Sequence, residues 1–508
     1  MLIEHPRIYL DATQAHTDAI LIRDQKVVTT GDEARHGASS SDVILRPDGR
    51  CLFPAPGDAH IHLWGLGLRA GTVDLRGLDA DEALEALAEA SPRDDGWVFA
   101  TNLDEHQFRR GQQISRRQLD RLFPNHPVRI HRVDRHAIWV NSAALKRAGI
   151  DEDFKPGDGG DAERDDNGKL TGLLVDAAMM PVLNAIPETT LAEDRATFLD
   201  SAQKLREQGV AFCTIARCPV AHIEMLEDLA DDRALPLHID ALVAGTDDAL
   251  DDWCRQGPIE RSEEGLRIAG IKFYADGALG SSGAHLLQPY RQGKRGLKMH
   301  SEGFLKQRIP ELMKDGWQVA VHAIGDAAAR EVLDAFEQVP PAVRRALRPR
   351  LEHAQMIAPE DMQRFSELDV IASIQPIHLR SDAPWAPKLL TEAQLRRLFP
   401  WRSIMPAVLA AGSDYPIDDL NPWHGIATAL TRQGANGVPF RPEESLTRSE
   451  ILAAYTGGAA FASHRESELG ALHPGFRANI VALDTDPFEA EPDEIWDTKA
   501  TFVGDENP

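Results

Sequence analysis

The sequence predicts an α/β protein whose main domain is a closed parallel (β/α)8 barrel, also called a TIM barrel. Two observations lead to this fold class. From residue 205 onward, strand-like apolar runs alternate with stretches of helical length, and together with one earlier run the candidate strands number eight. The eight runs are 52–62, 210–216, 237–243, 268–277, 318–326, 350–356, 370–376 and 406–414.

The two chain ends have a pattern different from that of the barrel region. Residues 1–50 contain short alternating segments separated by turns rich in Asp, Gly and Ser, which is typical of a small antiparallel β unit. The strand-like run A-N-I-V-A-L-D near the carboxyl end has the same pattern. We therefore expect both ends, residues 1–53 and 465–508, to form one small β-sandwich domain beside a barrel that spans residues 54–464.

Residues 65–205 are too long for a single connection between two barrel strands. We expect them to form a mixed α/β insertion after the first barrel strand, in which W-V-F-A-T-N-L (97–103) and V-R-I-H-R-V (128–133) are strands. Within it, the acidic stretch 79–90 has the pattern of an exposed helix face.

The amino-acid composition of the chain disfavours several classes of protein. The formal charge of -25 disfavours nucleic-acid binding, which depends on cationic contacts to phosphate. No apolar run is long enough to span a bilayer, and the amino terminus lacks the pattern of a secretory signal. The four cysteines include no C-x-x-C pair, so we expect them to be reduced. We expect a cytoplasmic protein with a small-molecule substrate and no nucleic-acid or membrane partner. A homodimer is an assembly that the sequence allows.

The stretch D-A-H-I-H-L-W-G places His60 and His62 at the end of the first predicted barrel strand. Side chains at positions i and i+2 of a strand point to the same side, so both imidazoles would face one point. Neutral imidazole is a common ligand for zinc. Taken alone, the pattern fits equally well two half-buried histidines that bind nothing.

Four more polar residues lie in or at the ends of other predicted barrel strands: Lys272 in the fourth, His322 in the fifth, His353 in the sixth and Asp414 in the eighth. Reactive side chains of such barrels gather at the carboxyl ends of the strands. Each residue alone has an ordinary structural explanation, but six of them at one rim favour a metal site. A ligand set of nitrogen and oxygen without thiolate favours zinc or a similar divalent ion.

Six motifs, in chain order, resemble those of the amidohydrolase superfamily, and specifically its family 3 branch of metal-dependent hydrolases. They are D-A-H-I-H-L-W-G, I-K-F-Y-A-D-G-A-L-G-S-S-G-A, V-H-A-I-G-D-A-A, L-E-H-A-Q, S-I-Q-P-I-H and G-S-D-Y-P-I. The resemblance covers nearly the whole chain, and the branch includes proteins similar to N-substituted formamide deformylase. Two positions depart from the family pattern, because Ala55 replaces a usual glycine and Asn479 a common Asp. Neither is a ligand.

The resemblance implies a site for two divalent metal ions per chain, with zinc as the expected metal. In that site His60 and His62 bind the more buried ion, Lys272 bridges both ions, His322 and His353 bind the second, and Asp414 contacts the metal and the attacking water. Lys272 would act as its N-carboxylated form. An unmodified Lys272, either paired with Asp276 or beside a single ion, is the competing account.

The expected function is hydrolysis of a carbon–nitrogen bond other than a peptide bond, in an amide, N-acyl or N-formyl small molecule. Two ions that share a water lower its pKa, so a metal-bound hydroxide would be the nucleophile. Asp414 would orient this nucleophile, accept its proton and pass the proton to the leaving nitrogen. The chain has no G-x-S-x-G motif that would offer a serine nucleophile.

Substrate contacts are expected from residues that follow the fourth and seventh strands. Asp276 and Ser281 follow the fourth, and Gln375 and His378 follow the seventh. They could hydrogen-bond the substrate or equally hold the metal ligands in place. In the insertion, His136 could project over the barrel mouth or have a packing role.

Two other functions stay open on the sequence. The first is a mononuclear deaminase that opens an amidine carbon, which would bind one ion per chain. Lys272 favours the binuclear site, because a bridging carboxylate is unnecessary with one ion. The second is a non-catalytic regulatory or binding relative. The presence of every expected ligand type, and the lack of a helix-turn-helix segment, argue against it.

Overall fold

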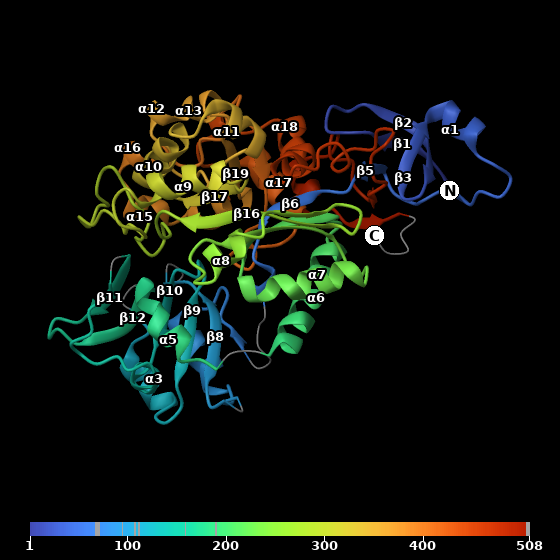
Figure 1. The fold of residues 1–508 in the computed structure, drawn as a ribbon. Coiled ribbons are helices and arrows are strands. Elements are labelled where there is room, and N and C mark those ends of the chain that lie inside the picture. Colours follow the sequence, from blue (N-terminus) through green and yellow to red (C-terminus); the bar gives the residue numbers. More distant parts are fainter. Residues whose placement is uncertain are drawn as a thin grey trace.

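The computed structural model describes residues 1–66, 72–93, 95–105, 108–109, 112–157, 159–187 and 190–503. Figure 1 shows the barrel between a lobe formed by the insertion and a small sheet near both chain ends. The last part of the predicted terminal domain, residues 504–508, and short parts of the predicted insertion lie outside the described residues.

The described part of the chain contains a barrel of eight parallel strands, which confirms the predicted TIM-barrel fold. In order across the sheet, the strands are β20 (Leu409–Ala411), β19 (Ile371–Ile374), β18 (Arg350–His353), β17 (Gln318–Ala323), β16 (Leu266–Tyr274), β14 (His238–Ala244), β13 (Phe212–Cys218) and β6 (Gly57–Ile61). A short strand, β15 (Ile259–Arg261), pairs antiparallel with β16.

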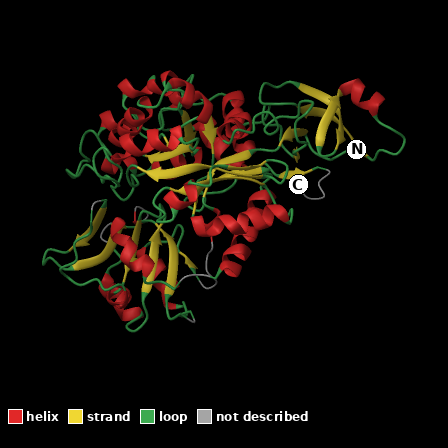
Figure 2. Cartoon of the chain, in the orientation of Figure 1, coloured by secondary structure: helices red, strands yellow, loops and turns green. Residues whose placement is uncertain are grey.

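The barrel strands are buried on both faces. All seven residues of β14, H-I-D-A-L-V-A, are buried, as expected for a strand covered by helices outside and side chains inside. The surrounding helices are amphipathic: α10 (Asp326–Glu337) buries Val332, Leu333 and Phe336 on one face. Figure 2 shows these helices packed around the strands.

The other helices of the barrel region are α6 (Leu191–Glu207), α7 (Ile223–Asp231), α8 (Leu250–Cys254), α9 (Phe304–Lys314), α11 (Pro341–Leu347), α12 (Pro359–Met362), α13 (Arg364–Glu367), α14 (Pro376–Asp382), α15 (Ala386–Leu389), α16 (Glu392–Leu395), α17 (Pro422–Thr431), α18 (Arg448–Ala453) and α19 (Ala459–Ala462). Helix α6 follows the insertion and leads into β13.

The first and last strands of the barrel meet at their carboxyl ends. The backbone N–H of Asp414 donates to the carbonyl of His60 (2.7 Å), and that of His62 donates to the carbonyl of Tyr415 (3.0 Å). The buried carboxylate of Asp58 accepts from the backbone N–H of His60 (3.0 Å) and from the Ser413 hydroxyl (2.5 Å). These bonds connect β6 to the segment after β20.

The predicted strand 52–62 is wrong as a single strand. It consists of β5 (Cys51–Pro54), which belongs to the terminal sheet, and β6, which opens the barrel. Pro56 lies between them and lacks the N–H that a continuous ladder requires. The backbone N–H of Ala55 instead donates to the carbonyl of Asn479 (2.9 Å), so the two positions that depart from the family pattern are bonded to each other.

Both chain ends contribute to one seven-stranded sheet of the described residues. Its strands are β22 (Ala500–Phe502), β21 (Ile480–Leu483), β5, β1 (Leu2–Tyr9), β2 (His16–Arg23), β3 (Lys26–Thr30) and, beside β1, β4 (Ile44–Leu45). Two short helices, α1 (Gly31–Gly37) and α20 (Pro492–Trp496), accompany these strands in the chain. The antiparallel pairing of β1, β2 and β3 agrees with the prediction for residues 1–50, whereas a sandwich of two sheets stays a prediction.

The insertion has its own six-stranded sheet within the described ranges. The sheet contains β11 (Gly160–Arg164), β12 (Leu170–Asp176), β10 (Ala137–Val140), β9 (Val128–Arg132), β8 (Val98–Leu103) and β7 (Val73–Asp74), with helices α2 (Ala80–Ala88), α3 (Arg116–Leu122), α4 (Ser142–Arg147) and α5 (Met180–Asn184). The two predicted insertion strands correspond to β8 and β9.

None of the described helices combines the length and the apolar character that crossing a bilayer requires. The four cysteines are unpaired.

Replacement of Asp58 tests the closure of the barrel. Asp58→Ala leaves buried donors of His60 and Ser413 without an acceptor, and each orphaned donor costs roughly 1–3 kcal/mol. We expect a thermal midpoint several degrees lower by circular dichroism. Asp48→Ala, at an exposed position of the terminal sheet, is the matched control and should melt like the parent. Equal melting of the two variants would contradict this account of the closure.

Candidate metal centre

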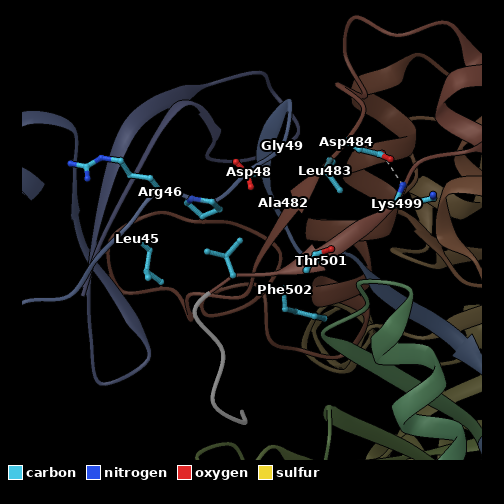
Figure 3. Close-up of a pocket in the computed structure, with 12 residues that line it drawn as sticks. Leu45, Arg46, Asp48, Gly49, Ala482, Leu483, Asp484, Lys499, Thr501 and Phe502 are labelled. Atoms are coloured by element: carbon cyan, nitrogen blue, oxygen red, sulfur yellow. Dashed lines mark hydrogen bonds between the residues drawn. The ribbon is translucent and has the colours of Figure 1, made fainter.

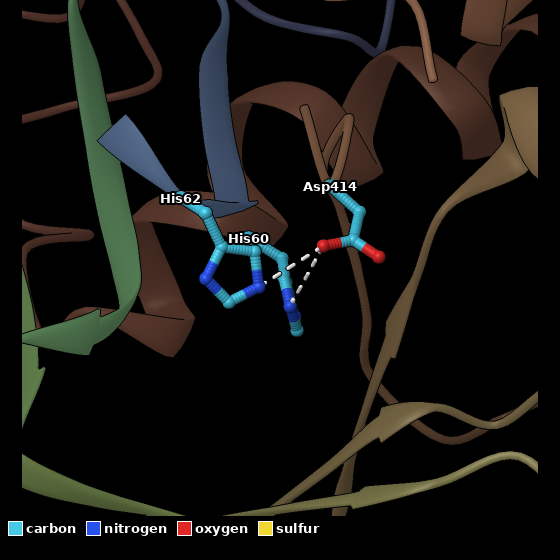
Figure 4. Close-up of side chains that lie close together, drawn as sticks. All are labelled: His60, His62 and Asp414. Carbon is cyan, nitrogen blue, oxygen red and sulfur yellow. Dashed lines mark ion pairs between the residues drawn. The ribbon is translucent and has the colours of Figure 1, made fainter. Parts of the chain in front are cut away.

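His60 and His62 lie at the carboxyl end of β6, and Asp414 follows β20 at the same end of the barrel. The Nε2 atoms of His60 and His62 are 3.4 and 3.2 Å from the same carboxylate oxygen, Oδ1 of Asp414. Figure 4 shows both rings directed toward this oxygen. The i, i+2 spacing therefore brings the two imidazoles to one point, as predicted.

The second carboxylate oxygen of Asp414 faces another pair of histidines. Its Oδ2 is 3.9 Å from Nδ1 of His353 and 3.6 Å from Nε2 of His378. Each pair of histidines forms, with Asp414, a group whose ligand atoms lie within 4.8 Å of one another. From the sequence we expected His378 to contact the substrate or to hold a metal ligand in place, but its position beside Asp414 makes it a candidate ligand.

His322 ends β17 next to this second group. Its ring centroid is 4.4 Å from that of His353, and its Nε2 lies 3.4 Å from the carbonyl of Gly277 and 3.5 Å from a carboxylate oxygen of Asp276. The structure therefore brings His322 to the cluster, with its Nε2 nearer to the loop after β16 than to Asp414.

Lys272 is buried in the same cluster, with 1% of its surface exposed. Its amine has no hydrogen-bond partner among the described residues and lies 4.6 Å from the ring centroid of Tyr274. Burial lowers the pKa of this amine to about 8, although the carboxylates of Glu352 and Asp414 oppose the shift. Lys272 therefore has a larger neutral fraction near neutral pH than an ordinary lysine has.

The proposed pairing of Lys272 with Asp276 is wrong. The Asp276 carboxylate is buried and accepts hydrogen bonds from the backbone N–H groups of His285 (2.8 Å), Ile324 (3.0 Å) and Gly325 (2.8 Å). Its acceptor capacity is used by the two loops after β16 and β17. Asp276 therefore holds the loop that follows His322 in place.

The buried polar atoms of the cluster fit a divalent cation. Buried polar groups in folded proteins almost always have a hydrogen-bond partner. Here the following buried atoms have none in the described structure: Nε2 of His60, Nζ of Lys272, Nδ1 of His353, Nε2 of His378 and Oδ1 of Asp414. Nitrogen and oxygen donors without thiolate are the ligand set of zinc and similar ions.

The protonation states of His62, His353 and Asp414 suit metal ligation, which requires neutral imidazole and ionised carboxylate. His60 differs, because burial would lower its pKa but the carboxylates of Asp414 and Glu352 outweigh this effect and raise its pKa. Burial lowers the pKa of His62 to about 4 and the pKa of His353 well below its ordinary value. Burial opposes ionisation of Asp414, yet the neighbouring His60 and His62 hold the pKa of its carboxyl well below the usual range. Near neutral pH, His62 and His353 are neutral and Asp414 is an anion.

Two of the candidate ligands have left-handed backbone conformations. The φ angle is 75° at His353 and 55° at Asp414, both unusual for residues other than glycine. Such conformations persist only where the surrounding structure enforces them, and they are concentrated at functional sites. The chain turns at these two residues as it leaves β18 and β20.

Glu352 is a site residue that the sequence analysis missed. One of its oxygens lies 2.5 Å from Nδ1 of His60, and the other accepts from Nε of Arg350 (2.7 Å). A carboxylate on one ring nitrogen fixes the orientation of the imidazole and leaves the other nitrogen for the cluster. The signal was present as an acidic residue within the buried strand R-L-E-H.

Two other predicted contact residues, Gln375 and Ser281, differ in whether their side chains have a hydrogen-bond partner. Gln375 is buried, and its Oε1 has no hydrogen-bond partner in the described structure. Ser281 donates to the carbonyl of Ala278 (3.3 Å), so its hydroxyl closes a local turn.

His136 is brought from the insertion to the cluster. Its ring centroid is 5.2 Å from that of His322, and its Nδ1 lies 2.5 Å from Oδ1 of Asp176. Burial alone would lower its pKa, but the Asp176 carboxylate raises the pKa of His136 to about 9. The insertion therefore contributes a histidine–carboxylate pair to the barrel mouth.

A separate hollow of about 610 Å³ lies in the terminal sheet, where Arg46, Asp48 and Lys499 are among the lining residues. Figure 3 shows these side chains around it. None of the predicted site residues lines this hollow. We therefore assign the chemistry to the barrel mouth.

The double variant His60→Ala/His62→Ala tests the first histidine pair. It should lose bound metal, measured by elemental analysis, while its far-ultraviolet circular dichroism stays that of the parent, because a barrel of this size has sufficient core without ions. A matched control, His16→Ala/His36→Ala, removes two exposed histidines of the terminal domain and should retain the metal. Unchanged metal content in the first variant would contradict the assignment of His60 and His62 as metal ligands.

The chain is similar to several known proteins over nearly its whole length. The chain is 31% identical to YtcJ of Bacillus subtilis (strain 168) over 502 residues, which cover 94% of this chain and 93% of that protein. It is 29% identical to the N-substituted formamide deformylase of Arthrobacter pascens, with 96% of this chain and 93% of the relative covered. An uncharacterized metal-dependent hydrolase from Pyrococcus furiosus has a similar structure, with a TM-score of 0.75, 26% identity and coverage of 96% and 99%. The profile of the amidohydrolase family matches residues 48–504, and the chain belongs to this family of metal-dependent hydrolases.

Proposed function

We propose that the protein hydrolyses a carbon–nitrogen bond other than a peptide bond, in an amide, N-acyl or N-formyl small molecule. One observation carries the proposal: a buried carboxylate, Asp414, lies between two pairs of imidazoles and near a buried lysine amine that has no hydrogen-bond partner in the described structure. The name of one relative, an N-substituted formamide deformylase, supports the choice of a carbon–nitrogen bond.

The site would hold two ions, with zinc as the proposed metal. His60 and His62 would ligate one ion, His353 the other, and Asp414 faces both positions. His322 or His378 would complete the second position. The presence of two separate histidine groups supports the binuclear site over the mononuclear deaminase, which needs one group only.

Lys272 would bridge the ions after carboxylation. In this reaction the neutral amine forms an N–C bond to carbon dioxide and loses one proton, which yields an anionic carbamate. The burial of Lys272 and its lowered pKa support the neutral amine that this reaction requires. The two oxygens of the carbamate would then form the anionic bridge, which an uncharged amine cannot form.

The ions, when bound, would supply a water of lowered pKa as the nucleophile and would polarise the substrate carbonyl. Asp414 would orient that water through one oxygen, accept its proton and donate it to the leaving nitrogen. Glu352 would keep His60 in the orientation that ligation needs. His136, held by Asp176, and Gln375, with its unpartnered buried oxygen, would contact the substrate.

The proposal is tested by a hydrolysis screen of N-formyl, N-acyl, lactam and ester compounds with metal-loaded protein. We expect turnover of at least one carbon–nitrogen compound, loss of turnover on chelation and recovery with zinc. Metal analysis should give two ions per chain, whereas the deaminase alternative predicts one. Metal-loaded protein that binds but never hydrolyses these compounds would favour the regulatory alternative.

Asp414→Asn should reduce turnover by about 10²- to 10⁴-fold, because the amide cannot accept the proton. Most of the metal should remain, since the amide oxygen still faces the histidines. Elemental analysis beside steady-state kinetics checks both statements. Asp419→Asn, an exposed carboxylate five residues farther along the chain, is the control and should stay within a few-fold of the parent. Similar turnover of the two variants would assign the proton transfer to another residue.

Lys272→Ala should lose at least one ion per chain, because no bridging anion can form. Formate or acetate should then restore part of the activity by supplying a carboxylate in its place. Metal content and rescue kinetics are compared with Lys314→Ala, an exposed lysine on α9 that should need no rescue. Electron density that ends at the Lys272 nitrogen in a metal-loaded crystal would exclude carboxylation.

A further inference from the structure

Arg217 is the exposed residue of β13, the second strand of the barrel. The other six residues of this strand, within Phe212–Cys218, are buried. The side chain of a barrel strand points either outward to the helices or into the interior, and an inward one that is exposed has to lie at an open end of the barrel. The register of the neighbouring strands decides between these directions.

A β-bulge changes the direction of the side chains at the end of β13. Ladder pairing matches Thr214 with Asp240 and Cys218 with Val243, so β13 advances four residues while β14 advances three. An inserted residue of this kind changes the direction of the side chains that follow it, and such bulges are common beside active sites.

The bulge turns Arg217 toward the barrel interior. Asp240 faces the interior, where its carboxylate contacts Arg267 (2.8 Å). Because side chains alternate along β14, Val243 points outward, and so does its ladder partner Cys218. Arg217, one residue before Cys218, therefore points inward.

Arg217 also lies toward the mouth. On the other side of β13, Ile215 pairs with Ile61 of β6. Because the bulge adds one residue to β13 between Ile215 and Cys218, Arg217 is at the level of His62, at the carboxyl ends of the two strands. An inward side chain at this level is exposed because it lies above the packed interior, at the rim of the candidate metal centre.

The guanidinium of Arg217 has no counter-ion among the residues that the structure describes. Other arginines of the barrel interior are paired: Arg267 with Asp240 at 2.8 Å and Arg350 with Glu352 at 2.7 Å. Over all described residues, the side chain of Arg217 makes neither a hydrogen bond nor an ion pair. This is notable in a chain with a formal charge of -25, which has many carboxylates to offer.

The charge of Arg217 acts on two groups of the candidate metal centre. Burial raises the pKa of the Tyr274 phenol to about 12, and the positive charge of Arg217 opposes this shift; the same charge also lowers the pKa of the Lys272 amine. The guanidinium thus lies near Tyr274, and with it near the amine of Lys272. The carboxylates of Asp414 and Glu352 also act on Tyr274, but neither forms an ion pair with Arg217, so the guanidinium can attract an anion from solution.

We propose that Arg217 binds a carboxylate of the substrate, so that the enzyme acts on N-acyl or N-formyl amino acids and similar anions in preference to neutral amides. This inference rests on the proposed hydrolase function. The planar guanidinium offers two parallel N–H groups, which match the two oxygens of a carboxylate. The scissile amide would then lie between Arg217 and the histidine cluster.

Paired probes test the inference. Each pair contains an N-acylated amino acid and the same compound without its carboxylate, for example N-acetylphenylalanine and N-acetylphenethylamine, in N-formyl and N-acetyl series. The ratio of kcat/KM within a pair should favour the acid in the parent, and Arg217→Gln should reduce that ratio by about 10- to 100-fold. Arg217→Lys, which keeps the charge but not the fork, should retain part of the preference. Arg255→Gln, an exposed arginine after α8, is the control and should keep the parent ratio.

Binding measured by calorimetry separates this inference from the proposed function. If the acids bind more tightly in an Arg217-dependent way but are not hydrolysed, the result supports the anion site. It then contradicts only the proposed hydrolase function. Hydrolysis with no preference for the acids, or a preference that Arg217→Gln leaves unchanged, overturns the inference and leaves the hydrolase in place. A third probe, N-acetyl-O-phosphoethanolamine, distinguishes phosphate from carboxylate, and a preference for it alone overturns the carboxylate assignment.

Discussion

The contact between the first and last strands of the barrel determines both the fold and the site. The backbone N–H of Asp414 reaches the carbonyl of His60 at 2.7 Å, and the side chains of the same two residues approach to 3.4 Å. Asp58 reinforces this contact by accepting from His60 and Ser413. The residues that close the barrel are therefore those that present the ligand atoms. A site built in this way is rigid, because its geometry cannot change without opening the barrel.

A buried chain of charges maintains that geometry. Arg350 donates to Glu352 (2.7 Å) and to the carbonyl of Ala59 (2.6 Å), while Glu352 contacts Nδ1 of His60 (2.5 Å). Burying such charges is costly unless every member is paired, and their net contribution to stability is small. Their value here is positional, because the strand before His60 and the ring of His60 are both held by the same arginine–glutamate pair.

The sequence allowed prediction of the features that depend on local pattern. Eight apolar runs of strand length indicated the barrel, and the spacing of His60 and His62 indicated that their rings converge. The partnership of His60 with Glu352 joins residues 292 positions apart, and no local pattern reports such a pair. Likewise, the sequence left a pairing of Lys272 with Asp276 open as the competing account, but the carboxylate instead accepts from three backbone N–H groups.

The glycines of the motif after the fourth barrel strand leave room for a carboxylate of the insertion. Asp176 of the insertion holds His136 through one oxygen, and a Cβ atom built on Gly277 or Gly283 would lie 2.2 or 2.6 Å from the other. No side chain fits at either glycine unless Asp176 moves, so the loop can enclose this carboxylate only with glycine at both positions. Since Gly277 follows Asp276, which holds the loop after His322, the same motif connects the insertion to the candidate metal centre. The sequence A-D-G-A-L-G-S-S-G-A thus contains none of the proposed metal ligands, and its glycines allow it to enclose the carboxylate that holds His136 beside the histidine cluster.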